Sequence, residues 1–372
     1  MSQRRIVFLI GLGLVATLML FIAPMASAGG PSDIPNPALV ENNVCLGCHS
    51  SKELSMKLPS GEVLSLYTDE AAFNASVHGK QGQRCTACHT NITGYPHPQA
   101  LARDIRDFSI QMYAICQQCH TKEYKDNIDS MHSKEIGRGD RDAAICTDCH
   151  TAHYVTPPDT PRAKIAQTCR KCHNLIYDQY KSSVHGAALL DQSNPDVPTC
   201  IDCHGVHGAI SDPRTEQFRL KSPDICAKCH TNKAMMKKYD ISTNVMNTYV
   251  ADFHGTTVEL FVKQSPNQPS NKPVCYNCHG VHDIRSTQDP KSSVIKENLL
   301  KTCQQCHPDA TGDFPTSWMS HFDASPTQYP AMYYVNLFYT IFIPVIIGGM
   351  LGFVVLDAGR RILNRFKKSG SD

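Results

Sequence analysis

Two long apolar runs lie near the ends of the chain, and the stretch between them mixes apolar and polar positions. The first run extends from Ile6 to Phe21, and the second covers the 22 uncharged residues from Val335 to Leu356. Between them, apolar residues recur at helical spacing only in short segments, such as 175–184 and 223–239, separated by loops rich in proline and glycine. Residues 61–67 alternate as an arm of a hairpin would. The pattern predicts a mainly α fold with extensive irregular loops.

The first apolar run has the features of an export signal. Arg4 and Arg5 precede it, and Ala26-Ser27-Ala28 follows it as a cleavage sequence. We expect residues 1–28 to be a signal peptide, with an uncleaved N-terminal anchor as the alternative. In either case the central region is exported, so we expect residues 29–325 to lie in the periplasm.

The second apolar run is long enough to cross a bilayer, and we expect a transmembrane helix at 335–357. Five basic residues lie in the tail 358–372, which the positive-inside rule places in the cytoplasm: Arg360, Arg361, Arg365, Lys367 and Lys368. Trp318 precedes the run with three tyrosines, either as an interfacial belt or packed in the exported domain. Pro344 lies mid-span, and Gly348 and Gly352 would let a second helix approach. We therefore expect a single C-terminal anchor in the inner membrane that contacts an integral membrane partner.

The exported region contains nine Cys-x-x-Cys-His motifs, which use all eighteen cysteines. We number them in chain order: Cys45, Cys48, His49; Cys85, Cys88, His89; Cys116, Cys119, His120; Cys146, Cys149, His150; Cys169, Cys172, His173; Cys200, Cys203, His204; Cys226, Cys229, His230; Cys275, Cys278, His279; and Cys303, Cys306, His307. This spacing is typical of c-type haem attachment, in which two thioether bonds hold the porphyrin and the adjacent imidazole binds the iron. Zinc sites would not need a histidine at that position every time, and disulfides would explain only the even cysteine count. We expect nine covalently bound haems c.

Nine further histidines match the nine motifs one to one, and we expect them to be the distal iron ligands: His78, His97, His132, His153, His185, His207, His254, His282 and His321. The alternative for any one of them is an exposed or buried imidazole with no iron. Two imidazoles on every iron would leave no open coordination position, so we expect no catalytic residue in this chain.

The order of motifs and spare histidines repeats along the chain. Each unit holds a motif, a histidine, a second motif and a second histidine. The units are unit 1 (about 40–100), unit 2 (112–160), unit 3 (165–212), unit 4 (222–286) and a half-unit (299–325). Because these units should stack, we expect an elongated cytochrome built from two-haem repeats.

Chain geometry limits which iron each spare histidine can reach. His153, His207 and His282 follow their motif histidine by three residues and cannot pass around the porphyrin, so they should ligate a different haem. The intermediate histidines have enough chain to reach the far face of the preceding haem: His78, His132, His185, His254 and His321. His97 stands eight residues after His89, outside the pattern, and is the least regular member of the set.

The segments CTDCHTAH, CIDCHGVH and CYNCHGVH, with SVHG and DFHG before them, resemble the paired-CXXCH multihaem cytochromes c. The similarity covers Cys45 to His321. With the anchor, it resembles the periplasmic subunits of quinol-oxidising inner-membrane complexes.

The resemblance implies a bis-His haem wire carrying electrons between an inner-membrane quinone-linked partner, such as a cytochrome b-like subunit, and periplasmic redox proteins. Such a chain would be a non-catalytic subunit of a quinol:acceptor oxidoreductase. The alternatives are a tethered electron relay or store without a membrane partner, and a multihaem reductase with one open haem. No basic patch suggests nucleic-acid binding, and the exported region carries about three more acidic than basic residues, which suits a basic redox partner.

Overall fold

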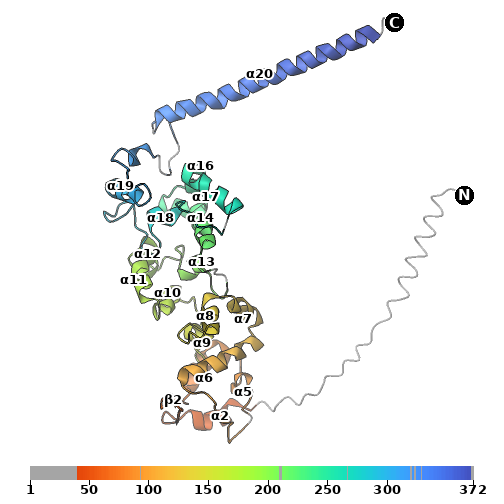
Figure 1. Cartoon of the computed structure of the whole chain (residues 1–372). Helices are drawn as coiled ribbons and strands as arrows, with labels where there is room; N and C mark the ends of the chain where they lie inside the picture. Colours follow the sequence, from red (N-terminus) through yellow and green to blue (C-terminus); the bar gives the residue numbers. More distant parts are fainter. Residues whose placement is uncertain are drawn as a thin grey trace, which may run out of the picture.

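The computed structural model describes residues 40–369, except 93, 209–211, 266, 319–320, 322–323 and 328. The expected signal peptide at 1–28 lies outside the described residues. In Figure 1 the short helices follow one another along an elongated body, from α2 and β2 at one end to α19 at the other, and the long helix α20 projects beyond α19. The order in space thus follows the order in sequence.

The helices and strands can be grouped by the repeat units defined above. Unit 1 contains α2 (Asn42–His49), β1 (Ser55–Lys57), β2 (Val63–Ser65), α3 (Glu70–Ala75), α4 (Val77–Lys80) and α5 (Cys85–Cys88). α6 (Ile105–Met112) lies between unit 1 and unit 2. The next two units contain η1 (Tyr113–Gln118), α7 (Thr121–Ile128), α8 (Met131–Gly137), α9 (Cys146–His150), α10 (Ala163–Arg170), α11 (Asn174–Lys181), α12 (Val184–Leu190) and α13 (Cys200–His204). The remainder consists of α14 (Glu216–His230), α15 (Lys233–Met236), η2 (Lys237–Tyr239), α16 (Val245–Ala251), α17 (Phe253–Gln264), α18 (Cys275–His279), α19 (Lys296–Gln304), η3 (Pro315–Ser317) and α20 (Pro330–Ser369). The expectation of a mainly α fold with extensive loops is confirmed.

The hairpin expected at 61–67 is present as an antiparallel pair. β1 pairs with β2, with Met56 opposite Leu64. These are the strands that the described part of the chain contains.

The helix expected at 175–184 is divided in two. α11 ends at Lys181 and α12 begins at Val184, because the Ser183 hydroxyl accepts a hydrogen bond from the Gly186 amide at 3.0 Å and starts a new helix. The break places His185 in the first turn of α12. A serine N-cap therefore sets the position of a candidate ligand.

The helix expected at 223–239 begins seven residues earlier than predicted and ends at His230, and the shorter helices α15 and η2 follow it. Proline favours the first turn of a helix, yet Pro223 lies inside α14, which starts at Glu216. Proline has no amide to bond the carbonyl of Arg219, and the Ser222 hydroxyl donates to that carbonyl instead at 2.7 Å. The helix therefore continues through Pro223 to the seventh motif.

Few apolar side chains of the described region are buried within the polypeptide. The buried ones form small clusters, such as Ala166, Tyr180 and Leu189, and Leu220, Val258 and Val274. A domain of this length normally buries most of its apolar surface. Packing among these few side chains cannot by itself stabilise the fold. The fold leaves space for large apolar groups between the helices.

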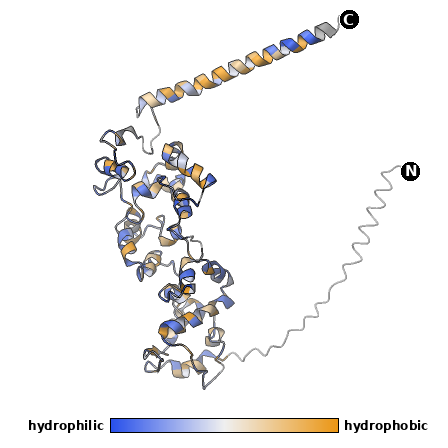
Figure 2. Cartoon of the chain, viewed as in Figure 1, coloured by the Kyte–Doolittle hydropathy of each residue, from blue (hydrophilic) through white to orange (hydrophobic). Residues whose placement is uncertain are grey.

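α20 is long and apolar enough to span a membrane. The most apolar 18-residue window of the segment Pro330–Arg365 has a mean hydropathy of 2.3, and none of that window is buried. Figure 2 shows apolar residues around most of this helix, whereas polar and apolar positions alternate in the shorter helices. The expected span 335–357 thus lies within a longer continuous helix, and Pro344 does not end it.

Candidate haem sites

The two motifs of each unit occupy opposite ends of helices. In the first motif of a unit the cysteines lie at or near the C-terminal end of a helix, as in α2, η1, α10, α14 and α19. In the second motif Cys85, Cys146, Cys200 or Cys275 is the first residue of a one-turn helix. The pairing of motifs visible in the sequence therefore corresponds to two distinct local structures.

A polar residue within the second motif holds that short helix in place. The Asp148 carboxylate accepts a hydrogen bond from the Ile145 amide at 2.8 Å, and Asp202 accepts one from the Thr199 amide at 2.6 Å. Asn277 accepts the equivalent bond from Val274 at 2.8 Å. These are capping interactions at the third helical position. The second motif of unit 1 has Ala87 there and lacks this bond.

A buried or half-buried arginine fixes the loop before three of these short helices. Arg106 donates to the carbonyls of Arg141 at 2.6 Å and Ala143 at 2.5 Å, and pairs with Asp148 at 2.9 Å. Arg219 donates to two loop carbonyls in the same way, at 2.5 and 2.6 Å. Arg162 pairs with Asp202 at 2.6 Å. Sequence reasoning missed these residues, although an arginine seven to ten positions before a first motif was a visible signal.

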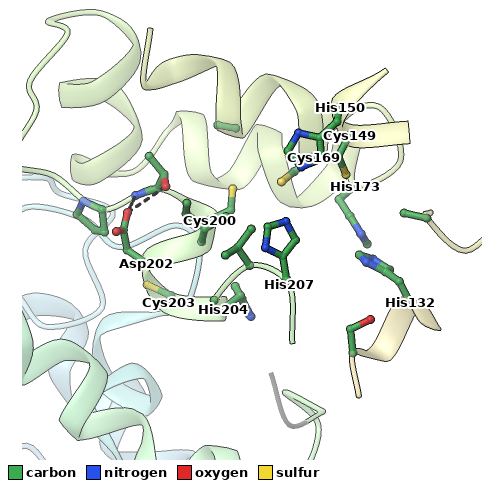
Figure 3. A pocket seen from close by; sticks show the side chains of 18 of the residues that line it. His132, Cys149, His150, Cys169, His173, Cys200, Asp202, Cys203, His204 and His207 are labelled. Atoms are coloured by element: carbon green, nitrogen blue, oxygen red, sulfur yellow. Dashed lines mark hydrogen bonds between the residues drawn. The ribbon is translucent and has the colours of Figure 1, made fainter. Parts of the chain in front are cut away.

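Each of the nine motif histidines faces one of the nine spare histidines. The ring centroids of every pair lie 5.9 to 6.3 Å apart: His49–His97, His89–His153, His120–His78, His150–His207, His173–His132, His204–His282, His230–His185, His279–His321 and His307–His254. In Figure 3, His132 and His173 point toward one another from separate segments. All eighteen histidines of the chain are used in this way.

This spacing fits an iron atom between two imidazoles. A metal about 2.0–2.1 Å from each ring nitrogen places the two ring centroids about 6.3 Å apart. The observed separations are at or just below that value. The residues present therefore fit nine haem irons, one between each pair.

The expected reach of the intermediate histidines was wrong. None of His78, His132, His185, His254 and His321 faces the histidine of the preceding motif; the first four face the first motif of the following unit, and His321 faces motif 8. The far face of the preceding porphyrin is within reach of the chain, but the serine-capped helices α4, α8 and α12 direct His78, His132 and His185 forward. The second histidine of each unit points backward, as His153 does toward His89. The expectation that His153, His207 and His282 face a motif other than their own agrees with the structure.

As a result, two histidine pairs of opposite direction cross each junction between units. The paired residues are about 40 to 80 positions apart in sequence. Backbone hydrogen bonds also connect neighbouring units. The Val77 amide donates to the Val155 carbonyl at 2.8 Å, and the Val184 amide donates to the Ile284 carbonyl at 2.9 Å. His97 is the exception: it faces His49 within unit 1, where no earlier unit exists in the repeat to supply a partner. This position explains its irregular spacing.

The motif cysteines of successive sites lie close together. The sulfur atoms of Cys116 and Cys146 are in hydrogen-bond contact, and the same contact joins Cys169 to Cys200. The Cys88 thiol lies near Cys116 and Cys119, and the Cys203 thiol near Cys226 and Cys229. Neighbouring sites therefore follow one another without a gap, both within a unit and across unit junctions.

One continuous cavity connects the sites. It has a volume of about 3140 Å³ and is lined by cysteines or histidines of the first eight motifs. An ordinary ligand site measures about 300–1,000 Å³, so this space accommodates several large groups in sequence. The ninth motif lies beside it, where His307 packs against Phe314 at 5.0 Å and faces the cavity-lining His254.

The histidines are held in the state that a metal ligand requires. Burial lowers the pKa of His185 to about 4 and also lowers the pKa values of His89, His204 and His279, which keeps these rings neutral at pH 7. The Nδ1 atom of His49 donates to the Leu66 carbonyl at 2.6 Å, which leaves Nε2 free.

Comparisons with protein families support the assignment. Residues 71–151 match the family of cytochrome c7 and related cytochromes c, and residues 139–175 and 195–235 match the doubled CXXCH motif family. Neither the curated proteins nor the solved structures gave a match. The helical fold and the CXXCH sites define a c-type cytochrome with several haems. The matched segments cover less than half of the chain; they support a multihaem c-type cytochrome family, whose domains imply electron transfer.

Proposed function

We propose that this cytochrome carries nine haems c, each iron bound by two histidines, and conducts electrons between an inner-membrane partner and periplasmic acceptors. The observation that carries the proposal is the set of nine histidine pairs at 5.9 to 6.3 Å. Haem bound at these sites supplies reversible one-electron chemistry at iron. The chain holds both axial positions, spaces neighbouring sites closely and excludes substrate from the metal.

The role of the chain as a conductor rests on its closed sites. A reductase needs at least one iron with an open coordination position, and each motif histidine here has an imidazole opposite it. This favours a non-catalytic electron-transfer subunit over a multihaem reductase.

The membrane attachment rests on α20. Its apolar length, the exposed surface around it and the basic residues Arg360, Arg361 and Arg365 beyond it suit a C-terminal anchor with a cytoplasmic end. The proposed topology is completed by the signal peptide predicted at 1–28.

The proposed membrane partner is an integral cytochrome b-like or quinone-binding subunit. Gly348 and Gly352 lie one helical turn apart, and an added Cβ at either would meet nothing within 4 Å. This narrow open face suits a second helix. A tethered relay or store that works without a partner remains the alternative function, and it would not use this face.

Haem content and spin state test the proposal. The purified full-length protein should contain nine haems c by haemochrome assay and intact mass, and its ferric form should give only low-spin electron paramagnetic resonance signals. A high-spin signal of one haem per chain would instead support a reductase, and fewer than nine haems would contradict the proposed conductor.

Purification in mild detergent tests the partner. The wild-type chain should co-purify with a multi-spanning subunit containing haem b. Gly348→Leu with Gly352→Leu should release that subunit, while Val354→Leu, about 120° from Gly348 and about 160° from Gly352 around the helix, should retain it. A chain that is isolated alone in every case would favour the tethered relay.

A further inference from the structure

One residue breaks the repeat next to a distal histidine. In units 1 to 3 a buried serine stands two positions before the first spare histidine of the unit: Ser76, Ser130 and Ser183. Each serine hydroxyl accepts a hydrogen bond from a backbone amide at 3.0 to 3.1 Å and caps a helix. In unit 4 the same position holds Asp252, which begins α17 without such a side-chain bond. The fourth unit therefore has a carboxylate where the others have a neutral hydroxyl.

The Asp252 carboxylate lies between two candidate iron sites. Its Oδ2 atom is 3.7 Å from Nδ1 of His254, which faces His307 of motif 9. Trp318, whose indole nitrogen donates to Oδ2 of Asp252, also contacts His321, which faces His279 of motif 8. Asp252 thus acts on the sites of motifs 8 and 9.

Trp318 holds the carboxylate in this position. Its indole nitrogen donates to Oδ2 of Asp252 at 2.5 Å, and its ring meets His321 edge-on at a centroid distance of 6.2 Å. This confirms the alternative in which Trp318 packs in the exported domain. The side chain of Asp252 is about one quarter exposed, which limits the screening of its charge by water.

We propose that Asp252 lowers the reduction potentials of the haems on motifs 8 and 9, the two sites nearest α20, relative to the other haems. A negative charge beside a distal imidazole stabilises ferric over ferrous iron, because the ferric site carries one more positive charge. Electrons that enter from the membrane side would then pass readily to haems of higher potential further from the anchor. The inference rests on the bis-His ligation proposed above, and it adds a preferred direction of electron flow, away from the anchor.

Asp252→Asn tests the charge and keeps the shape and a hydrogen-bond acceptor for Trp318. In a redox titration of the full-length protein, two of the nine haems should gain about tenfold in their ferrous-to-ferric ratio at a fixed ambient potential. This corresponds to an upward shift of about 59 mV for a one-electron couple. Asp252→Ser, which restores the serine of the other units, should give the same shift.

The matched control transfers the charge to another unit. Ser183→Asp places a carboxylate two residues before His185. Because His185 faces His230 of motif 7, this substitution should lower the reduction potential of the haem on motif 7. Unchanged potentials in Asp252→Asn and Ser183→Asp, with nine haems and low-spin spectra retained, would overturn the proposal. High-spin signals in the wild-type spectra would instead refute the proposed bis-His ligation. If Asp252→Asn loads haem poorly, the potential measured for Ser183→Asp alone decides whether a carboxylate at this position lowers the reduction potential.

Discussion

At the scale of single residues, the position after the motif histidine constrains the backbone. Gly205 and Gly280 follow His204 and His279 with φ of 74° and 81°, and Thr151 takes the same place after His150 with φ 61° and ψ 174°. Residues other than glycine rarely adopt this conformation, which costs about 1–3 kcal/mol. Unit 2 therefore tolerates strain at Thr151 that units 3 and 4 avoid.

We expect Thr151→Gly to raise the free energy of unfolding by about 1 kcal/mol, because it relieves this strain. Denaturant unfolding of the haem-loaded protein, followed by tryptophan fluorescence and circular dichroism, would measure the change. Thr121→Gly, at the exposed start of α7, is the control and should destabilise by up to about 1 kcal/mol. A loss of stability in Thr151→Gly would show that the threonine side chain has another role.

A second residue-scale prediction concerns close packing behind a distal histidine. A Cβ added at Gly186 would overlap the carbonyl oxygen of Tyr180 at the end of the preceding helix. Gly186→Ala should therefore separate α11 from α12 and destabilise by about 1–3 kcal/mol. Gly137→Ala, with nothing within 4 Å, should be neutral or slightly stabilising under the same thermal unfolding assay. Equal effects of the two substitutions would contradict the close packing.

At the scale of elements, arginine side chains connect helices to the loops that carry the second motifs. Arg106 on α6 donates through Nε and Nη2 to two loop carbonyls and through Nη1 to both carboxylate oxygens of Asp148 of α9. Lysine cannot reproduce this planar set of donors.

We expect Arg106→Lys to destabilise by about 2 kcal/mol, the range for hydrogen bonds to charged groups. Arg103→Lys is the control, since Arg103 is largely exposed and pairs only with Asp104 through its side chain, and its effect should stay within about 0.5 kcal/mol. Chemical denaturation with haem absorbance as a second probe would separate global unfolding from local loss at motif 4. If the two substitutions lowered the free energy of unfolding equally, the hydrogen bonds of Arg106 would contribute no more to stability than those of the exposed Arg103.

The anchor element gives a separate prediction. A chain that ends at Tyr329 lacks α20, whose most apolar 18-residue window has no buried residue. It should therefore partition into the aqueous phase of a detergent phase separation with its full haem content, while the full-length chain enters the detergent phase. Retention of the truncated chain in the detergent phase would point to a further membrane contact in the part of the chain that precedes α20.

At the scale of the whole molecule, the exchange of histidines between units makes the repeats interdependent. His132 of unit 2 faces His173 of unit 3, and His207 of unit 3 faces His150 of unit 2. Loss of one spare histidine should therefore affect a haem of a neighbouring unit.

We expect His132→Ala to convert one haem in nine to a high-spin form, detected by electron paramagnetic resonance. The signal should be absent when motif 5 cannot attach haem, as in Cys169→Ser with Cys172→Ser, because the affected iron is then missing. It should persist when motif 3 is removed by Cys116→Ser with Cys119→Ser. The reverse result would assign His132 to the preceding haem, as chain reach alone suggested.

The sequence allowed the class of sites and the long apolar C-terminal helix to be predicted, because these depend on local spacing. The CxxCH geometry is fixed within five residues, and a run of 22 apolar residues by itself predicts a long helix. The partner of each spare histidine could not be predicted, since every one of them has enough chain to reach more than one iron. The direction taken by His185 depends on the Ser183 cap and on the contact of Gly186 with Tyr180, which become visible only when the helices are packed.

The crossed histidine pairs also determine how such a chain can change in length. A copy of residues 165–212 inserted before unit 4 would receive one ligand from each neighbour and give one to each, so all irons would stay ligated. A single motif inserted alone would have no partner, and removal of half a unit would leave one iron without its second histidine and one histidine without an iron. Duplication therefore lengthens this cytochrome in steps of two haems, with His97 closing one end and His321 the other. The odd total follows from the half-unit that adjoins the anchor.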